Sequence, residues 1–253
     1  MIQFTEAQFL AWITPLLWPF ARVLALFATL PVLSQRYVPA RARVALALFI
    51  TVCAQPSLPL IPVVPLDSAL ALMVLVQQLL IGLSLGFAAR IVFAAIEFAG
   101  ELAGLQMGLN FAMFFDPTTG GAATSVSRFF GVTVAWLFIV INGHLLLIAA
   151  LVRSLHTFPV SAEPFAFLRA TQPQVWGAEI FALGLWIALP LVAMLLFVNL
   201  VLGVISRVAQ QMNIFAIGFP ITLSVGLIGV LLTLPMFQVP MTMALERMLG
   251  HFL

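Results

Sequence analysis

The sequence predicts an all-α, polytopic membrane protein built from broken helices and helical hairpins. Hydrophobic residues make up 64% of its 253 positions, and charged residues make up 7%. A soluble domain averages about 25% charged residues, so this composition favours an integral membrane protein. Prolines interrupt the long uncharged stretches, which predicts bent or broken helices instead of straight spans. We expect a single integral-membrane domain covering 1–253, with spans of about 20 residues. Alternating outward from the arginine-containing loop at 36–43 gives seven segments and a cytoplasmic C-terminus.

An apolar segment at 8–33 opens the chain and is interrupted by Arg22. A charge in the middle of a span is costly, so we expect a buried partner for it. The arginines between 36 and 43 lie in a short polar loop, which the positive-inside rule assigns to the cytoplasm, leaving the N-terminus outside. Residues 44–66 carry no charge. Prolines at every third position in their second half predict an extended, polyproline-like connection.

The middle of the chain contains two further candidate spans. Residues 68–89 are uncharged and are followed by Arg90, which either lies in a turn or continues the same helix. Residues 129–152 predict one clean span, which contains Asn142, Gly143 and His144. A membrane histidine can relay protons or bind a metal. No Asp, Glu or Cys lies within helical reach of His144, so a structural hydrogen bond is favoured.

The last third of the chain begins with its longest polar stretch, at 153–179. This stretch predicts an exposed connection with short interfacial helices, and it is the best candidate for a boundary between two halves. Residues 180–206 form a strong uncharged span. Residues 208–245 also carry no charge, but they are too long for one span of about 20 residues, so they predict a bent helix or a hairpin.

The stretch at 97–121 combines features that are unusual in a membrane helix. On a continuous helix of about 100° per residue, Glu97 and Glu101 lie about 20° to either side of Arg90, with two glycines within about 40°. Such a charged face is not expected against lipid, and small residues at every fourth position let another backbone approach closely. We therefore expect burial at a subunit interface; the alternative is a polar contact inside a monomeric helix bundle. The expected interface charges are Arg22, Arg90, Glu97 and Glu101, and the close-packing glycines are Gly100, Gly104 and Gly108.

Beyond these glycines the residues become large and deformable. A cluster of methionine and phenylalanine runs from Met107 to Phe115, and the stretch from Asp116 to Gly121 then stops any helix. Proline lacks the backbone donor, and paired glycines cost backbone entropy. Methionine is flexible and polarizable, which suits a surface that seals and then re-packs. Composition alone favours ordinary hydrophobic core over such a seal.

Several function classes find no support in the sequence. It contains no zinc-protease, paired-cysteine or nucleophile-elbow motif, and no nucleotide-binding phosphate loop. We therefore expect no enzymatic activity, no cofactor and no metal site. Glu97 and Glu101, four residues apart, form the one possible pair of carboxylates that could share a proton, which remains a minor alternative. The net charge of +2 is too small to indicate nucleic-acid binding.

Four blocks carry a resemblance to a known family. They are ARVLALFATLPVLSQRYVPARARVALAL at 21–48, GELAGLQMGLNFAMFFDP at 100–117, NGHLLLIAALVRSLHTFPV at 142–160 and NIFAIGFPITLSVGLIGVLL at 213–232. The chain resembles the FliR/SctT family, the R subunits of the flagellar type III protein-export gate and their injectisome counterparts. The segment LNFAMFFDP is more similar to the flagellar members than to the injectisome members.

The resemblance implies an assembly and a location. Such R subunits join the P and Q subunits (FliP and FliQ), and then FlhB and FlhA, in a helical channel that passes unfolded flagellar export substrates. The channel lies in the bacterial inner membrane within the flagellar basal body, partly displaced to the periplasmic side. The resemblance also implies a P-subunit-like part at 1–160 and a Q-subunit-like part at 175–253.

The resemblance further implies a pore plug between Gln106 and Ala122, here called the plug segment, and it favours a seal over plain core. The gate residues carried over are Gln106, Met107, Gly108, Leu109, Asn110, Phe111, Ala112, Met113, Phe114, Phe115, Asp116 and Pro117. Two other functions stay open from the residues alone. One is a secondary transporter of small solutes that uses Glu97 and Glu101, and the other is the homologous injectisome gate. An intramembrane enzyme would need a nucleophile–base pair, which the sequence does not suggest.

Overall fold

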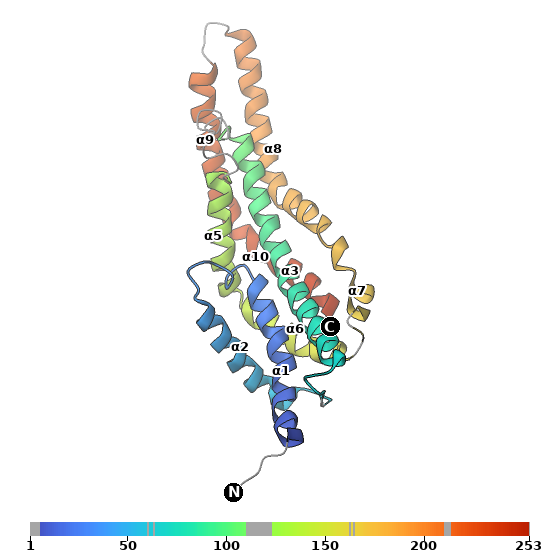
Figure 1. Ribbon diagram of the computed structural model, residues 1–253. Coiled ribbons are helices and arrows are strands. Elements are labelled where there is room, and N and C mark those ends of the chain that lie inside the picture. Colours follow the sequence, from blue (N-terminus) through green and yellow to red (C-terminus); the bar gives the residue numbers. More distant parts are fainter. Residues whose placement is uncertain are drawn as a thin grey trace. The chain divides into compact units, whose positions relative to one another are not determined.

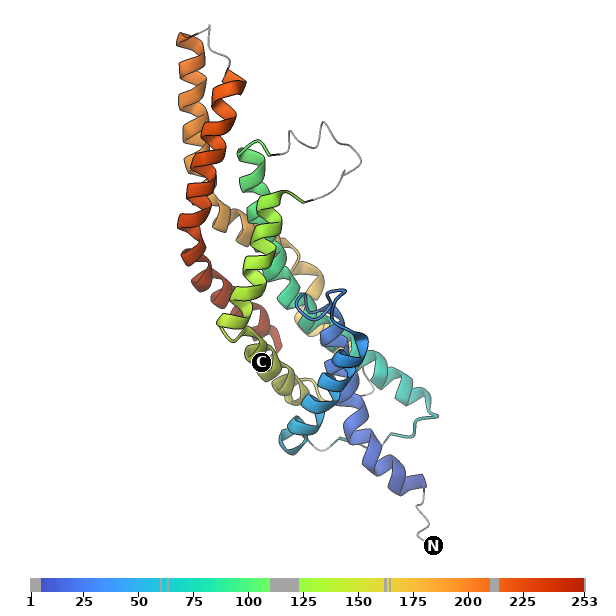
Figure 2. The ribbon, with the colours of Figure 1, turned by 90° about the vertical axis from the view of Figure 1, so that its left-hand side faces the viewer.

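The computed structural model is helical throughout the part of the chain that it describes (Figures 1 and 2). The described residues are 6–59, 61–62, 64–109, 123–161, 163, 165–209 and 214–252. Every regular element in these ranges is an α-helix or a short 3-10 helix. The predicted all-α class with broken helices is therefore confirmed.

The chain divides into two compact units, and each draws on separate parts of the sequence. The first unit comprises Met1–Arg90, Asn142–Trp176 and Leu245–Leu253, and the second comprises Ile91–Ile141 and Gly177–Ala244. Both units therefore contain residues from before 160 and from after 175. These two units are defined by which residues pack together, whereas the parts 1–160 and 175–253 that the family resemblance implies are continuous stretches of sequence. The two divisions therefore do not coincide.

In the first unit, α1 (Glu6–Thr29) packs along α2 (Ala40–Ala54), and both views show them side by side (Figures 1 and 2). After α2 and the 3-10 turn η1 (Gln55–Ser57), Leu58 takes an extended conformation with φ −83° and ψ 149°. No regular helix occurs in the described residues from there until α3 begins at Ala69. The proline-rich stretch thus forms no regular α-helix in its described residues, as predicted, although it begins with a 3-10 turn and not with extended chain.

The first unit is completed by α6 (Gly143–Thr157), α7 (Ala166–Thr171) and two 3-10 helices, η3 (Pro173–Val175) and η5 (Gly250–Phe252). Trp176 stacks on His251 with ring centroids 5.0 Å apart, and Phe167 stacks on Phe252 at 5.6 Å. These ring contacts bind the end of the chain to the polar stretch 153–179. That stretch contains the short helices that we expected, but it is not exposed throughout, because Phe167 and Trp176 are buried.

Helix α3 (Ala69–Gln106) runs without a break for 38 residues. Arg90 therefore lies inside a helix and not in a turn, so the charges of α3 share a face as their spacing predicts. Gly82 and Gly86 allow the first part of α3 to touch α1. A Cβ atom added at Gly82 would lie 2.8 Å from the Cβ atom of Ala25 and would also strike the backbone carbonyl of Arg22.

The predicted clean span at 129–152 is wrong. The chain forms α5 (Ser125–Val140), then breaks, and starts α6 at Gly143. Asn142 at the break has a left-handed backbone with φ 57°. Asparagine is one of the few side chains that tolerate this conformation, which a continuous helix cannot contain. The Asn-Gly pair was visible in the sequence, but its apolar surroundings suggested an unbroken helix.

In the second unit, α8 (Ala178–Val208) and α9 (Ile214–Thr233) pack side by side as a long hairpin (Figures 1 and 2). The 3-10 helix η4 (Leu234–Phe237) separates α9 from α10 (Gln238–Leu249). Pro235 lies at the start of η4, where a backbone N–H would have no acceptor within the helix, so the proline costs no helical hydrogen bond. The described part of the uncharged region 208–245 thus forms α9 and α10 with a 3-10 interruption between them, which agrees with the predicted bent helix or hairpin.

Within the described residues, four helices are long and apolar enough to cross a membrane, or five if α5 and α6 count as one span. The predicted number of about seven segments is therefore too high. Helix α3 takes in both 68–89 and the charged stretch that follows, in a single element. Helix α2 has only 15 residues, which is short for a span of about 20.

Candidate functional site

The C-terminal end of α3 and the N-terminal end of α5 meet at the two sides of the predicted plug segment. We call this pairing the stem, made of residues 97–105 from α3 and 124–131 from α5. All of the stem lies in the second unit. Of the plug residues carried over by resemblance, Gln106, Met107, Gly108 and Leu109 are described here. The remaining ones, Asn110 to Pro117, lie outside the described residues.

Helix α3 ends in a Schellman motif centred on Gly108. The backbone N–H of Gly108 donates to the carbonyl of Leu105 at 3.0 Å, and that of Leu109 donates to the carbonyl of Gly104 at 3.1 Å. Gly108 has φ 78°, a left-handed conformation that glycine adopts without a Cβ penalty. Gly108 is thus a helix terminator, whereas its spacing suggested a third close-packing position.

Glu101 joins the two sides of the stem. Its Oε2 atom accepts hydrogen bonds from the backbone N–H and the hydroxyl of Thr124, each at 3.0 Å. Thr124 is the N-cap of α5, and its hydroxyl oxygen in turn accepts from the N–H of Ser127 at 3.2 Å. A carboxylate at a helix N-terminus is favoured by the helix dipole and satisfies donors that have no partner within the helix.

The other stem contacts are close backbone approaches at glycine. A Cβ atom added at Gly100 would lie 2.9 Å from the Cα atom of Ser127, and one added at Gly104 would lie 2.9 Å from the Cβ atom of Thr124. The hydroxyl of Ser127 also donates to the carbonyl of Glu97 at 2.9 Å. Gly100 and Gly104 therefore perform the close-packing role that their spacing indicates, and their neighbour is α5 of the same chain.

Met107 fixes the start of the plug segment to α9. Its side chain is fully buried. A Cβ atom added at Gly226 of α9 would lie 2.6 Å from Cγ of Met107 and would strike its terminal methyl group. The methionine thus fills the space that the glycine leaves open.

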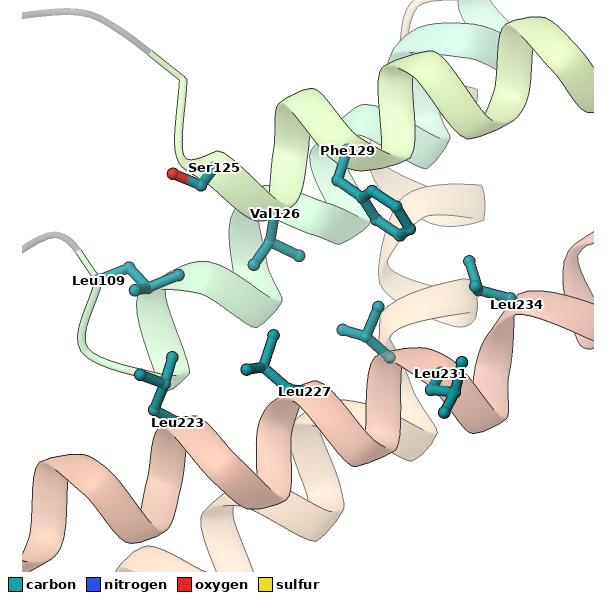
Figure 3. Close-up of a pocket in the computed structure, with 9 residues that line it drawn as sticks. Leu109, Ser125, Val126, Phe129, Leu223, Leu227, Leu231 and Leu234 are labelled. Carbon is teal, nitrogen blue, oxygen red and sulfur yellow. The ribbon is translucent and has the colours of Figure 1, made fainter.

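An apolar cavity of about 440 Å³ lies beside the stem within the second unit. Figure 3 shows Leu109 and Val126 on one side of it and Leu223 and Leu227 of α9 on the other. Phe129 and Leu231 line it further along. The lining offers one polar side chain, Ser125, so the cavity lacks the convergent polar groups that a small-solute site requires.

Arg22 is fully buried within the first unit and has partners on α3 and α6. Its Nε donates to Oε1 of Gln78 at 2.8 Å, and its Nη1 donates to the carbonyl and the hydroxyl of Ser154 at 2.7 and 3.0 Å. Its Nη2 donates to the carbonyl of Phe158 at 2.8 Å. These carbonyls belong to the C-terminal end of α6, where a cation is favoured by the helix dipole. The chain itself therefore surrounds this charge, without a second subunit.

The glutamine pair next to Arg22 extends the same network. Gln78 donates to Oε1 of Gln77 at 2.9 Å, and Gln77 donates to the carbonyl of Pro159 at 3.2 Å and to the hydroxyl of Ser161 at 2.8 Å. The N–H of Ser161 returns a hydrogen bond to Gln77 at 3.1 Å. The network thus fastens the segment that follows α6 onto α3.

The charged residues on the shared face of α3 differ from Arg22 in that they are not fully buried. Arg90 and Glu97 are exposed on this chain, and Glu101 is half-buried. Glu97 lies against α5, because a Cβ atom added at Gly131 would lie 3.0 Å from its Oε1 atom. Glu97 and Glu101 thus contact different places on α5. Among the residues that the structure describes, no group of three His, Cys, Asp or Glu side chains is arranged to hold a metal.

Comparison with known proteins identifies the family. A family model described as "Bacterial export proteins, family 1" matches residues 13–248 of the chain. The chain belongs to this family. It is 47% identical over 230 residues to the flagellar biosynthetic protein FliR of Escherichia coli strain K12, covering 90% of this chain and 87% of the relative.

Two further FliR proteins extend the comparison. That of Pectobacterium carotovorum is 44% identical over 239 residues, with 93% and 90% of the two chains covered. That of Aquifex aeolicus is 32% identical over 243 residues, with 96% and 92% covered. The chain is therefore a membrane protein of the flagellar export apparatus and a member of a non-enzymatic family.

Several residues of this FliR-family chain were not identified from the sequence. Thr124 and Ser127 have the spacing of an N-cap and its third helical residue, which is a detectable signal for the start of α5. Gln77 and Gln78, a polar pair inside an uncharged helix, were a signal for a partner to Arg22. Gly226 had no signal of its own, because its contact with Met107 is a tertiary one.

Proposed function

We propose that this chain is a core subunit of the flagellar export gate, whose plug segment closes the export channel at rest and moves aside for unfolded substrates. Family membership supports the place in the export apparatus. Phe and Met side chains between 107 and 115 supply large apolar groups that can re-pack around a passing chain. The channel itself would be formed together with other subunits.

The observation that carries the proposal is the joining of the two ends of the plug segment by Glu101 and Thr124. A segment that leaves and returns at one fixed base can be displaced without dismantling the helices on either side of it. A plug needs this property, because it has to move and then return to the same place. A linker between two independent helices would not need its ends held together.

The proposed partners are FliP, FliQ, FlhB and FlhA, in the inner membrane within the flagellar basal body and partly on its periplasmic side. Large apolar side chains on the α8–α9 hairpin remain uncovered in the single chain, including Phe197, Leu231 and Leu232. Arg90 and Glu97 are also uncovered. Exposed charges in membrane helices are better accommodated by neighbouring subunits than by lipid. We propose that 1–160 occupies a P-like position and 175–253 a Q-like position in this assembly.

The test is the resting ion leak of the assembled gate after deletion of residues 110–116. We expect the leak to rise, because the apolar groups that fill the lumen are removed. A second variant replaces the same residues with an equal number of Gly and Ser, which keeps the stem unstrained while removing the side chains. Conductance that stays at the unmodified level in both variants, at equal amounts of assembled gate, would eliminate the proposal.

A further inference from the structure

We propose that the start of α2 and its outer face form a binding site for an anionic phospholipid. The headgroup phosphate lies at Arg36 and Arg41, and one acyl chain follows the helix. All residues of the site belong to the first unit. The site does not involve the plug segment, so it can be tested separately from the proposed gating. It also gives a task to the arginines at 36–43, which the gating does not use.

The arginines at the start of α2 have no acidic neighbours in the sequence. Between residues 7 and 66 the chain contains four arginines and no Asp or Glu. Arg36 precedes α2 and Arg41 lies in its first turn, and both are exposed. That turn carries no acidic residue and no side-chain cap. Because cations are unfavourable at the positive end of a helix dipole, an anion bound beside them would be stabilising.

Arg43, in the same turn, has a donor without an acceptor. Its side chain is half-buried, and in the part of the chain that the structure describes its Nε atom is buried without a hydrogen-bond partner. A buried donor that lacks a partner is costly. Phosphate oxygens accept paired hydrogen bonds from a guanidinium group. A headgroup phosphate would therefore supply an acceptor that the described residues do not.

Tyr37 is consistent with a position at the level of the lipid headgroups. It is the single tyrosine of the chain, it follows Arg36 directly, and it is 80% exposed. Tyrosine is enriched where a membrane meets water, because its ring is apolar and its hydroxyl is polar. The start of α2 therefore combines cations with an aromatic side chain that suits the membrane–water interface.

An exposed apolar stripe leads away from Arg41 along α2. On a helix of about 100° per residue, Leu48 and Val52 lie about 20° to either side of Arg41. Both side chains are half exposed on this chain. The buried residues of α2, Ala47 and Thr51, lie about 80–120° away from the stripe, on the side that packs along α1. The cation and the apolar stripe thus share one outward face.

The length of the stripe matches one acyl chain. Arg41 and Val52 are separated by 11 positions, which at about 1.5 Å per residue gives about 16 Å. The hydrocarbon core of a bilayer is about 30 Å thick, so one leaflet contributes about 15 Å. Helix α2 has only 15 residues, which is short for a complete span. Its outward face therefore corresponds in length and polarity to a single lipid of one leaflet.

A helix of a neighbouring subunit is the other occupant that such a face could accept. The observations favour a lipid, because the cations lie at one end of α2 and the stripe beyond them is apolar. An anionic phospholipid has this same division between a charged head and an apolar chain. The following experiment distinguishes the two occupants.

Cys53 provides a reporter beside the stripe. It is exposed, it follows Val52, and it is the single cysteine of the chain, so it can carry a bimane fluorophore. The labelled chain is assembled into the export gate with cysteine-free partner subunits and reconstituted in phosphatidylcholine vesicles. Phosphatidylglycerol or phosphatidylcholine with a doxyl spin label on one acyl chain is added at equal mole fraction. Quenching of the bimane then reports which lipid occupies the stripe.

We expect labelled phosphatidylglycerol to quench the fluorophore more strongly than labelled phosphatidylcholine. Arg36→Gln combined with Arg41→Gln should lower the relative association constant of the anionic lipid by about 25-fold, or about fivefold for each arginine. Quenching by phosphatidylcholine should not change. The matched control combines Arg153→Gln with Arg169→Gln, two exposed arginines elsewhere in the first unit, and should keep the preference.

Three results would overturn the proposal, with all variants compared at equal amounts of assembled gate. The first is equal quenching by the two lipids in the unmodified chain, and the second is a preference that the Arg36–Arg41 variant keeps or that the control variant loses equally. The third is quenching by neither lipid, which would show that a protein subunit covers the stripe. Because the measurement is quenching and not conductance, it is separate from the leak expected on deletion of 110–116.

Discussion

Arg22 and Glu101 are two charges in apolar helices, and they differ in how many elements of the fold they join. Arg22 is fully buried and binds acceptors on α3, on α6 and in the segment after α6. Glu101 is half-buried, and among the described residues it hydrogen-bonds to Thr124. The arginine therefore joins several elements at once, whereas the glutamate joins only the two ends of one segment.

The partners of Arg22 and Glu101 show that a charge in a membrane helix does not by itself indicate transport chemistry. Arg22 donates to two carbonyls at the C-terminal end of α6, a task that a guanidinium performs well because its donors form a rigid fork. Glu101 meets the unpaired donors at the start of α5. Each charge therefore complements a helix end of opposite polarity, as the helix dipole requires.

The largest expected effect is at Arg22. Arg22→Met should destabilise the chain by about 2–6 kcal/mol, because the amide oxygen of Gln78 and the carbonyl of Phe158 lose the donor they have in the unmodified chain, at about 1–3 kcal/mol each. Arg22→Lys should be less stable than the unmodified chain but more stable than Arg22→Met, since an ammonium group cannot reproduce the forked hydrogen bonds of a guanidinium. The thermal midpoint and the yield of the purified gate complex measure both variants. A complex with Arg22→Met that is as stable as the unmodified one would contradict the structural role of Arg22.

A smaller effect is expected for alanine at the glycines of the second unit. Gly100→Ala should cost about 1–3 kcal/mol, because the new methyl group meets the backbone of Ser127, which cannot move aside. Gly226→Ala should cost less, because it meets only the flexible side chain of Met107. Gly203→Ala, where nothing lies within 4 Å, is the matched control. Thermal unfolding of the complex ranks the three, and the opposite order of Gly100 and Gly226 would contradict the rigid stem.

Much of the fold could be predicted from composition and from the pattern of apolar residues and prolines. The contacts between helices could not be predicted in this way. The apolar stretches located most helices, and the prolines located the extended connection after α2. The break at Asn142 was missed because hydrophobicity outweighed one turn-forming pair. The long continuous α3 could not be distinguished from two shorter helices, because a charge such as Arg90 fits a turn as well as a buried face.

For the candidate site, spacing showed which residues of α3 share a face, but not what they face. The pairing of Glu101 with Thr124 and that of Arg22 with Ser154 link residues 23 and 132 positions apart. Nothing in local sequence specifies such pairs. Gly108 fits the same spacing as Gly100 and Gly104, but it lies just beyond the end of α3 and terminates it.

The most direct test of the account is photo-crosslinking from Met113 in a gate that holds a trapped, partly exported substrate. Val132, an exposed residue of α5, provides the control position. We expect a photoreactive side chain at position 113 to form an adduct with the trapped substrate and one at position 132 to form none. Substrate adducts that are absent at 113, in a gate shown to hold the substrate, would contradict it.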